Sequence, residues 1–392
     1  MKEFDIVIVG GGPAGIMAAI ASGNSKVAIL EKNNKLGLKL LITGGGRCNI
    51  TNNKPIRKLL NSYKDKNFLK HSFYTLTNEK LLKLFEDKGL GFKEEEDNRI
   101  FPETDKSGDV LDILKEYLNN TEIILNYPVT DIIKKDDCFL INDEIKASKV
   151  IITTGGMTYP HTGSSGDGFK LANKLSQPIK TPYYGLTPLI CDDNLLKELS
   201  GVGLYNVVVK TKSSSFKGDV LITHTGLTGP AVLNLSNEAL NEIAIDLIPD
   251  LNREELNNKF IKDSAGKGKL KLKNYLKVYL TSSFIEYFLN RLDINGDKQL
   301  SNLSKKERNS IIDSLKGLKF KIVDVNKDLS KITVGGVDLN YINSKTMEST
   351  LIKGLYFAGE VLDTVGPTGG YNLKIAFSTG YLAGRSAYSN LG

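Results

Sequence analysis

The chain has 392 residues, 40% hydrophobic and 25% charged, with 52 Lys and Arg against 45 Asp and Glu for a formal net charge of +7. This composition predicts a folded protein of two or three domains and excludes global disorder. Its three cysteines, Cys48, Cys138 and Cys191, form no Cys-x-x-Cys pair, which argues against a disulfide framework or a structural zinc site. The sequence has no uninterrupted apolar run of about 18 residues, the length that a membrane-spanning helix needs. We therefore expect a cytoplasmic protein without membrane contact.

The N-terminal residues carry the pattern of a nucleotide-binding unit. Residues 4–9 are a nearly continuous apolar run, typical of a strand buried on both faces of a parallel sheet. A Gly-x-Gly-x-x-Gly turn follows at residues 10–15, then an Ala-rich helix to residue 22 and a second strand at 26–30. Because strand, turn, helix and strand come in this order, we expect a Rossmann-like α/β domain.

Each glycine of this turn has a physical role in binding a pyrophosphate. Gly10 permits the tight turn, Gly12 lets the backbone approach the phosphates, and Gly15 allows the helix to pack closely on the strand. The helix N-terminus offers free N–H groups to the anion. Glu31 lies about 20 residues further on, where an acid accepts hydrogen bonds from the adenosine ribose and disfavours a 2′-phosphate. NAD or FAD is therefore expected, and NADP is not.

Two further glycine-rich segments favour FAD. Residues 39–52 follow the second strand, where a plain NAD domain would continue into a helix, and they contain Thr-Gly-Gly-Gly-Arg-Cys-Asn. Near the C-terminus, a strand at 354–360 ends in an acid, and a loop then leads to a helix that begins at Gly369. Such a strand–acid–loop–helix unit completes the FAD site of many flavoproteins, because the helix N-terminus stabilises negative charge on the flavin.

At this point the chain resembles the YhiN/BaiN-like flavoproteins, an FAD-dependent branch of the two-dinucleotide-binding-domain superfamily. The segments that carry the resemblance are spread over nearly the whole chain: residues 10–15, 39–52, 159–168, 223–230, 357–363 and 368–372. The resemblance implies an FAD-binding domain with an inserted small β-barrel-like domain and a helical insertion. It also implies reductive chemistry on a conjugated C=C bond.

The residues expected to bind FAD come from all of these segments. They are Gly10, Gly12, Pro13, Ala14, Gly15, Glu31, Lys32, Gly45, Gly46, Arg47, Cys48, Asn49, Val129, Thr154, Gly155, Gly359, Glu360, Gly369, Gly370, Tyr371 and Asn372.

Three domains are predicted, two of them inserted into the first. The FAD-binding domain takes residues 1–188 and 335–392. Short alternating strands predict a β-rich domain at 189–250 and 318–334. Helical apolar spacing, with two capping boxes, predicts a helical insert at 251–317.

The chain has neither a second dinucleotide motif nor a Cys-x-x-Cys dithiol, so we expect NAD(P)H to act as a transient reductant of the flavin. Reduction of a conjugated C=C bond by hydride from flavin N5 also needs an acid that protonates the other carbon. Cys48 is the first candidate, although Arg47 beside it could lower its pKa, and it could equally be a packing residue. His224 is the second candidate, with a structural role as its alternative, and His161 is the third. Tyr371 and Lys374 are further candidates for contact with substrate or flavin.

The resemblance leaves three functions open. The first is formation of dihydrouridine in 23S ribosomal RNA, the second is reduction of a small steroid- or bile-acid-type enone, and the third is a non-catalytic flavin- or RNA-binding assembly factor. Lysines clustered at 267–277 and basic residues at 305–308 could bind RNA phosphates, or could form a solvated face without a partner. A small-molecule substrate would need only an apolar pocket above the flavin.

Overall fold

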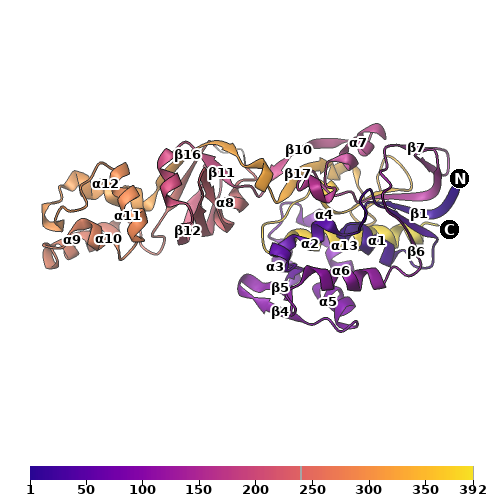
Figure 1. Cartoon of the computed structure of the whole chain (residues 1–392), viewed down its shortest axis with the longest axis horizontal. Coiled ribbons are helices and arrows are strands. Elements are labelled where there is room, and N and C mark those ends of the chain that lie inside the picture. Colours follow the sequence, from indigo (N-terminus) through magenta and orange to yellow (C-terminus); the bar gives the residue numbers. More distant parts are fainter. Residues whose placement is uncertain (239–240, 392) are drawn as a thin grey trace. The chain divides into compact units, whose positions relative to one another are not determined.

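The computed structural model describes residues 1–238 and 241–391 (Figure 1). It forms two compact units: Met1–Tyr184 with Lys331–Gly392, and Gly185–Ser330. Each unit has its own hydrophobic core, and each is described separately. The predicted division of the second segment into a β-rich domain and a helical domain stays a prediction, because its described residues cluster as one unit.

The first unit is built on a seven-stranded sheet with the order β6-β2-β1-β9-β8-β7, and β18 also pairs with β9. The pairs β6–β2, β2–β1, β1–β9 and β9–β18 are parallel, whereas β7, β8 and β9 pair antiparallel. This mixed sheet confirms the predicted Rossmann-like fold. The strands are β1 (Lys2–Val9), β2 (Val27–Leu30), β6 (Thr121–Ile124), β7 (Ile132–Lys134), β8 (Phe139–Ile141), β9 (Ile145–Ile152) and β18 (Leu355–Phe357).

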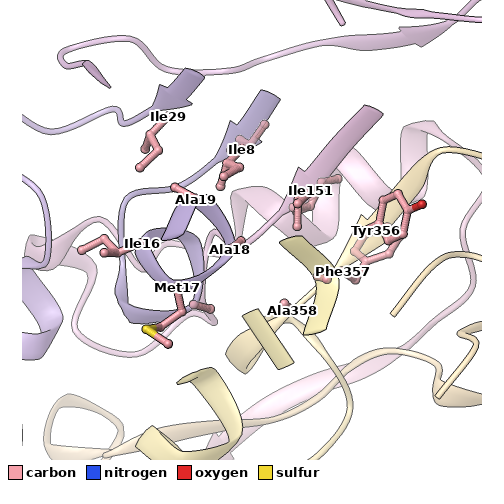
Figure 2. Close-up of a cluster of buried hydrophobic side chains, with 14 of the residues drawn as sticks. Ile8, Ile16, Met17, Ala18, Ala19, Ile29, Ile151, Tyr356, Phe357 and Ala358 are labelled. Atoms are coloured by element: carbon pink, nitrogen blue, oxygen red, sulfur yellow. The ribbon is translucent and has the colours of Figure 1, made fainter. Parts of the chain in front are cut away.

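The central strands are buried because helix α1 (Pro13–Ala21) covers one face with a continuous apolar surface. Figure 2 shows Ile8, Ile29 and Ile151, from three neighbouring strands, against Met17 and the alanines of α1. The near-continuous apolar runs in the sequence are thus explained by burial on both sides.

Helix α1 packs against the long C-terminal helix α13 (Tyr371–Ser389) with almost no space between the backbones. A Cβ added at Gly380 would lie 2.2 Å from the carbonyl oxygen of Ala14, and one at Gly384 would lie 2.0 Å from that of Ala18. A step of four residues along α13, from Gly380 to Gly384, thus matches a step of four residues along α1, from Ala14 to Ala18. The two helices therefore run in the same direction. At 1.5 Å per residue, the N-terminus of α13 therefore projects roughly 12 Å beyond that of α1.

The remaining elements of this unit surround the sheet. A three-stranded sheet has the order β3-β5-β4, and β10 pairs with β17. The strands are β3 (Thr51–Asn52), β4 (Phe92–Glu95), β5 (Arg99–Pro102), β10 (Ile179–Gly185) and β17 (Ile332–Val337). The helices are α2 (Leu38–Leu41), α3 (Ile56–Leu60), α4 (Lys66–Thr75), α5 (Asn78–Glu86), α6 (Ser107–Glu116) and α7 (Asp167–Lys174).

The second unit contains a closed antiparallel barrel, which confirms the predicted β-barrel-like element. Its order is β11-β14-β13-β12-β15-β16. The strands are β11 (Leu189–Cys191), β12 (Gly203–Lys210), β13 (Ser215–Ile222), β14 (Gly226–Thr228), β15 (Glu242–Asp246) and β16 (Leu318–Val325), and helix α8 (Pro230–Leu235) follows β14.

Four helices connect β15 to β16. They are α9 (Arg253–Gly266), α10 (Leu272–Leu276), α11 (Ser282–Arg291) and α12 (Lys305–Lys316). Both predicted capping boxes are present: Asn252 with Glu255 begins α9, and Ser304 with Glu307 begins α12. Within the described ranges, no helix has both the length and the apolar character needed to cross a membrane.

We predict that Gly384→Ala destabilises the first unit, because its methyl group would overlap the Ala18 carbonyl and force the two helices apart. The expected loss in the free energy of unfolding is about 1–3 kcal/mol. Urea denaturation followed by circular dichroism measures it. Gly108→Ala in α6 is the matched control, because nothing lies within 4 Å of its Cβ position, and it should be neutral or stabilising by up to about 1 kcal/mol. Equal midpoints for the two variants would contradict the packing argument.

Candidate active site

The turn between β1 and α1 has the shape that a pyrophosphate needs. A Cβ at Gly10 would lie 2.7 Å from the Thr153 carbonyl oxygen, and one at Gly15 would lie 2.0 Å from that of Gly10, so both positions exclude a side chain. At Gly12, by contrast, the space beyond the Cβ position is open. No side chain caps the N-terminus of α1, and its first-turn N–H groups have no partner within the helix. The open space and the free donors fit an anion in front of α1.

Glu31 closes this site at the end of β2. Its buried carboxylate accepts hydrogen bonds from the backbone N–H of Gly11 at 2.7 Å and from Asn33, through the backbone N–H at 2.9 Å and Nδ2 at 2.7 Å. The carboxylate is thus fixed beside the glycine turn. This is the position in which an acid reaches a ribose.

Lys32 connects this edge to the start of α7. Its Nζ donates to Asp167 Oδ2 and to Ser165 Oγ, both at 2.5 Å. The carboxylate's pKa is lowered, because hydrogen bonds from Lys32 and Ser165 outweigh partial burial. The ammonium group of Lys32, which the sequence predicted to bind the cofactor, is thus paired with a carboxylate of the protein itself. Val129, between β6 and β7, is half-buried against the core of this unit.

The two glycine-rich loops that favour FAD meet at the N-terminus of α13. In the amide orientation that satisfies both of its ends, Asn49 donates to the carbonyl oxygens of Thr51 and Ile100 and accepts from the Gly370 N–H at 3.1 Å. Asn52 Nδ2 donates to the Gly369 carbonyl at 3.3 Å. The sequence placed these loops some 320 residues apart, and the structure brings them into hydrogen-bond contact.

Glu360 lies in a polar network that connects α2, the loop after β9 and β17. Its carboxylate accepts from Lys39 Nζ at 2.6 Å, from the Thr333 backbone N–H at 2.8 Å and from Thr158 Oγ1 at 3.3 Å. The sequence predicted Glu360 as a cofactor residue but missed its partners. Lys39 could have been found from the sequence, because it begins the glycine-rich segment 39–52. Nothing in the sequence around Thr333 indicated that it contacts Glu360.

Gly359 and Gly155 position this network by close contacts. A Cβ at Gly359 would lie 2.8 Å from Ala14 Cβ, so the acidic turn rests on the first turn of α1. A Cβ at Gly155 would lie 2.7 Å from Ser164 Oγ. The hydroxyl of Thr154 is buried, and it faces the start of α7, where a Cβ at Gly168 would overlap it.

Cys48 lies inside the core and has no exposed surface. Burial raises the pKa of its thiol to about 12, although a hydrogen bond with Thr43 opposes the shift. The alternative in which Arg47 lowers this pKa is wrong, because Arg47 instead pairs with Glu95 and Asp105, with Nε 2.8 Å from Asp105 Oδ1. These facts favour the packing role, and the role as proton donor stays a prediction.

The other candidate donors differ in their surroundings. His224 belongs to the second unit, in the exposed turn between β13 and β14, and its catalytic role stays a prediction. His161 is exposed beside Tyr159. Lys374 is 1% exposed and donates to the Leu76 carbonyl at 2.6 Å, and burial lowers its pKa to about 7. Its side chain therefore serves packing between α13 and α4 and is not presented to a substrate.

Tyr371 also has its polar groups engaged within the protein. Its buried hydroxyl accepts from Lys54 Nζ at 2.9 Å, and its carbonyl accepts from Tyr63 Oη at 3.0 Å. Gly45 has no atom within 4 Å of its Cβ position, so the 43–46 turn is open on that side. Asn372 Oδ1 accepts from the Gly366 N–H at 2.8 Å and fixes the loop that leads into α13.

Fold and site together define the class. The parallel strands β1 and β2, the open glycine turn between β1 and α1, the acid at the end of β2, and Glu360 ahead of the N-terminus of α13 are features typical of a dinucleotide-binding site. The protein is an FAD-dependent oxidoreductase.

The family follows from comparison with known proteins. The family described as HI0933-like protein Rossmann domain matches residues 4–386, and the chain belongs to it. It is 30% identical to the ribosomal RNA dihydrouridine synthase of Escherichia coli, over 97% of each chain. It is equally similar, at 30%, to the enzyme of the same name from Haemophilus influenzae, over 96% of each chain. It is 28% identical to a 3-dehydro-bile acid delta(4,6)-reductase of Clostridium scindens, over 97% of this chain and 98% of that one.

A solved structure shows the same fold. A 3-ketosteroid-delta4-(5alpha)-dehydrogenase from Rhodococcus jostii matches 99% of this chain and 97% of its own, with a TM-score of 0.53 at 14% identity. The match supports the fold alone.

We predict that Gly12→Val folds normally but loses FAD, because no protein atom lies within 4 Å of the Cβ position and the side chain would extend into the open space in front of α1. Flavin absorbance per chain after purification should fall at least about tenfold, which corresponds to about 1.4 kcal/mol. Gly15→Ala is the comparison, since its methyl group would overlap the Gly10 carbonyl and should lower the melting temperature instead. Stoichiometric FAD in Gly12→Val would show that the pyrophosphate does not occupy this space.

We predict that one of the three thiols reacts with Ellman's reagent in the native protein at pH 8. Burial raises the pKa of Cys48 and of Cys191 to about 12, which lowers the thiolate fraction about a thousandfold; Cys138 is only half-buried. All three should react in denaturant. The thiols of Cys48 and Cys191 have an ordinary pKa of about 9 in the unfolded chain and keep their protons up to about pH 12 in the folded protein. The free energy of unfolding should therefore be unaffected by them below about pH 9 and should fall between about pH 9 and pH 12, where the unfolded chain loses these protons first. A second fast thiol that disappears in Cys48→Ala would contradict the burial of Cys48.

Proposed function

We propose that this enzyme reduces the C5=C6 bond of a uridine in 23S ribosomal RNA to form dihydrouridine. The observation that carries the proposal is the 30% identity to two ribosomal RNA dihydrouridine synthases over 96–97% of each chain. The similarity includes the inserted barrel and helices as well as the nucleotide-binding fold. A shared substrate class is therefore a stronger inference than it would be from the Rossmann-like part alone.

Different residues of the first unit are assigned to different parts of FAD. We assign the pyrophosphate to the N-terminus of α1 at Gly12, the adenosine ribose to Glu31 and the ribityl hydroxyls to Glu360. The N-terminus of α13, at Gly370, is assigned to the N1/O2 edge of the flavin, where its positive dipole end stabilises negative charge. When bound and reduced by NAD(P)H, the flavin of FAD would supply a hydride from N5. The parallel packing of α1 and α13 supports this order, because it separates the two helix N-termini along one direction.

Reduction of the uracil adds a hydride to C6 and a proton to C5. This step leaves the flavin oxidised, and oxidation of NAD(P)H then returns it to the reduced form. The chain then has to supply or relay the proton. The Cys48 thiol is protonated at neutral pH because its pKa is about 12. Its burial, however, means that the loop at 43–52 would have to expose it. His224 is the alternative donor, on a different unit of the protein.

A second candidate function is reduction of a small enone. The 28% identity to the bile acid reductase extends over nearly the full length of both chains, and this observation favours it specifically. The chemistry is the same, since both reactions add hydride to the β carbon of a conjugated carbonyl. A non-catalytic assembly factor is the third possibility, and a flavin that NAD(P)H reduces readily would contradict it.

We predict that deleting the gene removes dihydrouridine from large-subunit ribosomal RNA. Mass-spectrometric mapping of that RNA measures it, and the loss should be complete at the modified position. Plasmid-borne wild-type protein should restore the modification, and the flavin-free Gly12→Val variant should not. Unchanged dihydrouridine in the deletion strain would overturn the proposal. Steroid-type enone reduction by the purified protein in that case would favour the second candidate.

A further inference from the structure

A strongly basic surface lies on the first unit, outside the helical insert where the sequence suggested one. It consists of six cations on and around α3 and α4, which we call the α3–α4 surface: Lys54, Arg57, Lys58, Lys64, Lys66 and Lys70. Five of them are exposed and Lys54 is half-buried. Residues 53–76 contain a single acid, Asp65, whose pKa is raised by burial and by the nearby charge of Asp363.

The charge of this surface is not neutralised by the protein. Within the described part of the chain, no carboxylate lies within 4.0 Å of any of the six cations. In the helical insert, three of the clustered lysines are paired: Lys271 and Lys273 with Asp297 at 2.8 Å each, and Lys267 with Asp263 at 3.8 Å. Lys271 and Lys273 lower the pKa of Asp297 to about 2. Other cations of that insert, Lys269, Lys277, Lys305 and Lys306, have no carboxylate within 4.0 Å among the described residues, so the insert is partly neutralised whereas the α3–α4 surface is not neutralised at all. A polyanion would gain more from the unpaired charges than from the paired ones.

The α3–α4 surface is attached directly to the candidate active site. Helix α4 buries Leu69 and Phe73 in a small core shared with Tyr371, the first residue of α13. Lys54 Nζ binds Tyr371 Oη at 2.9 Å, and Tyr63 Oη binds the Tyr371 carbonyl at 3.0 Å. The surface therefore extends outward from the helix N-terminus to which we assign the flavin.

The exposed side of α4 also carries an aromatic residue. Tyr74 is 44% exposed and lies four residues after Lys70, which lies four after Lys66, so the three share one face of the helix. Cations that follow a phosphate backbone, with an aromatic ring on which a base can stack, are typical of surfaces that bind single-stranded nucleic acid.

A second feature limits the direction of binding. The acidic turn at Glu94–Asp97 contacts β3 through Asn52, whose Nδ2 donates to the Asp97 carbonyl, and through Asn53, which binds Glu94. Glu95 is paired with Arg47, but among the described residues no cation pairs with Glu94, Glu96 or Asp97, and the charge of these three acids would repel phosphates on the β4–β5 side. An approaching strand would therefore be directed over α3 and α4.

We propose that the α3–α4 surface binds the phosphate backbone of the RNA next to the uridine that is reduced. This inference rests on the proposed function, because it takes the substrate to be RNA. An anionic membrane is the competing partner, but Tyr74 is the one large hydrophobic residue of α3 and α4 that is markedly exposed. Interfacial helices need an apolar face as well as charge.

The test uses a triple variant of the full-length protein, Arg57→Gln with Lys58→Gln and Lys70→Gln. The matched control is Lys135→Gln with Lys345→Gln and Lys353→Gln, which removes the same charge from exposed positions without ion pairs elsewhere in the first unit. Probes are a fluorescent 20-nucleotide oligouridylate, vesicles of phosphatidylglycerol and large-subunit RNA from the deletion strain. Flavin absorbance per chain, which should be unchanged in both variants, shows that they are folded.

We expect the triple variant to bind the oligouridylate at least about tenfold more weakly. Its log–log salt slope should be smaller by about 2, since each lost phosphate contact contributes about 0.7. The kcat/KM for dihydrouridine formation should fall in parallel, mainly through KM, and the control should match the wild type.

Wild-type affinity and salt slope in the triple variant would overturn the inference. Loss of vesicle binding with unchanged RNA binding would overturn it in favour of a membrane. If the wild type binds RNA through this surface but forms no dihydrouridine, the proposed function fails and RNA binding by the surface stands. If it forms dihydrouridine and the triple variant does so with the same KM, the function stands and the inference fails.

Discussion

The close parallel packing of α1 against α13 is the constraint on which the site depends. Gly380 and Gly384 bring the α13 backbone against the carbonyls of Ala14 and Ala18, which no larger residue would permit. This contact joins the first nucleotide-binding helix to a helix encoded about 360 residues later. It also holds Gly359 and its neighbouring acid on the first turn of α1. Two positive helix ends and two carboxylates are thereby held in one unit of the protein.

The distribution of charge follows from the same arrangement. Cations near the glycine-rich loops are mostly paired: Lys32 with Asp167, Lys39 with Glu360, and Arg47 with Glu95 and Asp105. These ion pairs hold the loops in place through contacts within the protein, without a contribution from a cofactor. The cations of α3 and α4 are unpaired and point to solvent, although the same first residue of α13 connects the two regions. Basic residues that hold the loops together are thus distinct from those whose charge remains available at the surface.

Local signals predicted well where a short segment determines its own structure. The β1–α1–β2 unit, the capping boxes at Asn252 and Ser304 and the barrel strands follow from residues close together in the chain. Prediction was poorer for side chains whose partners are distant. Arg47 is next to Cys48 in sequence, yet its charge is bound by carboxylates about 50 residues away, and Lys374 is buried although its motif suggested a ligand contact.

Contiguous patterns of residues are sufficient to predict the class of fold, the glycine turn, the acid at the end of β2 and the resemblance to a flavoprotein family. Which of these segments meet in space is seen in the folded protein alone. The tertiary structure showed Asn49 bonded to Gly370, Glu360 bonded to Lys39 and Thr333, and Cys48 withdrawn into the core. It also decided which basic residues remain unpaired. The reason is physical: hydrogen bonding, ion pairing and burial depend on distances between residues that are remote in the chain.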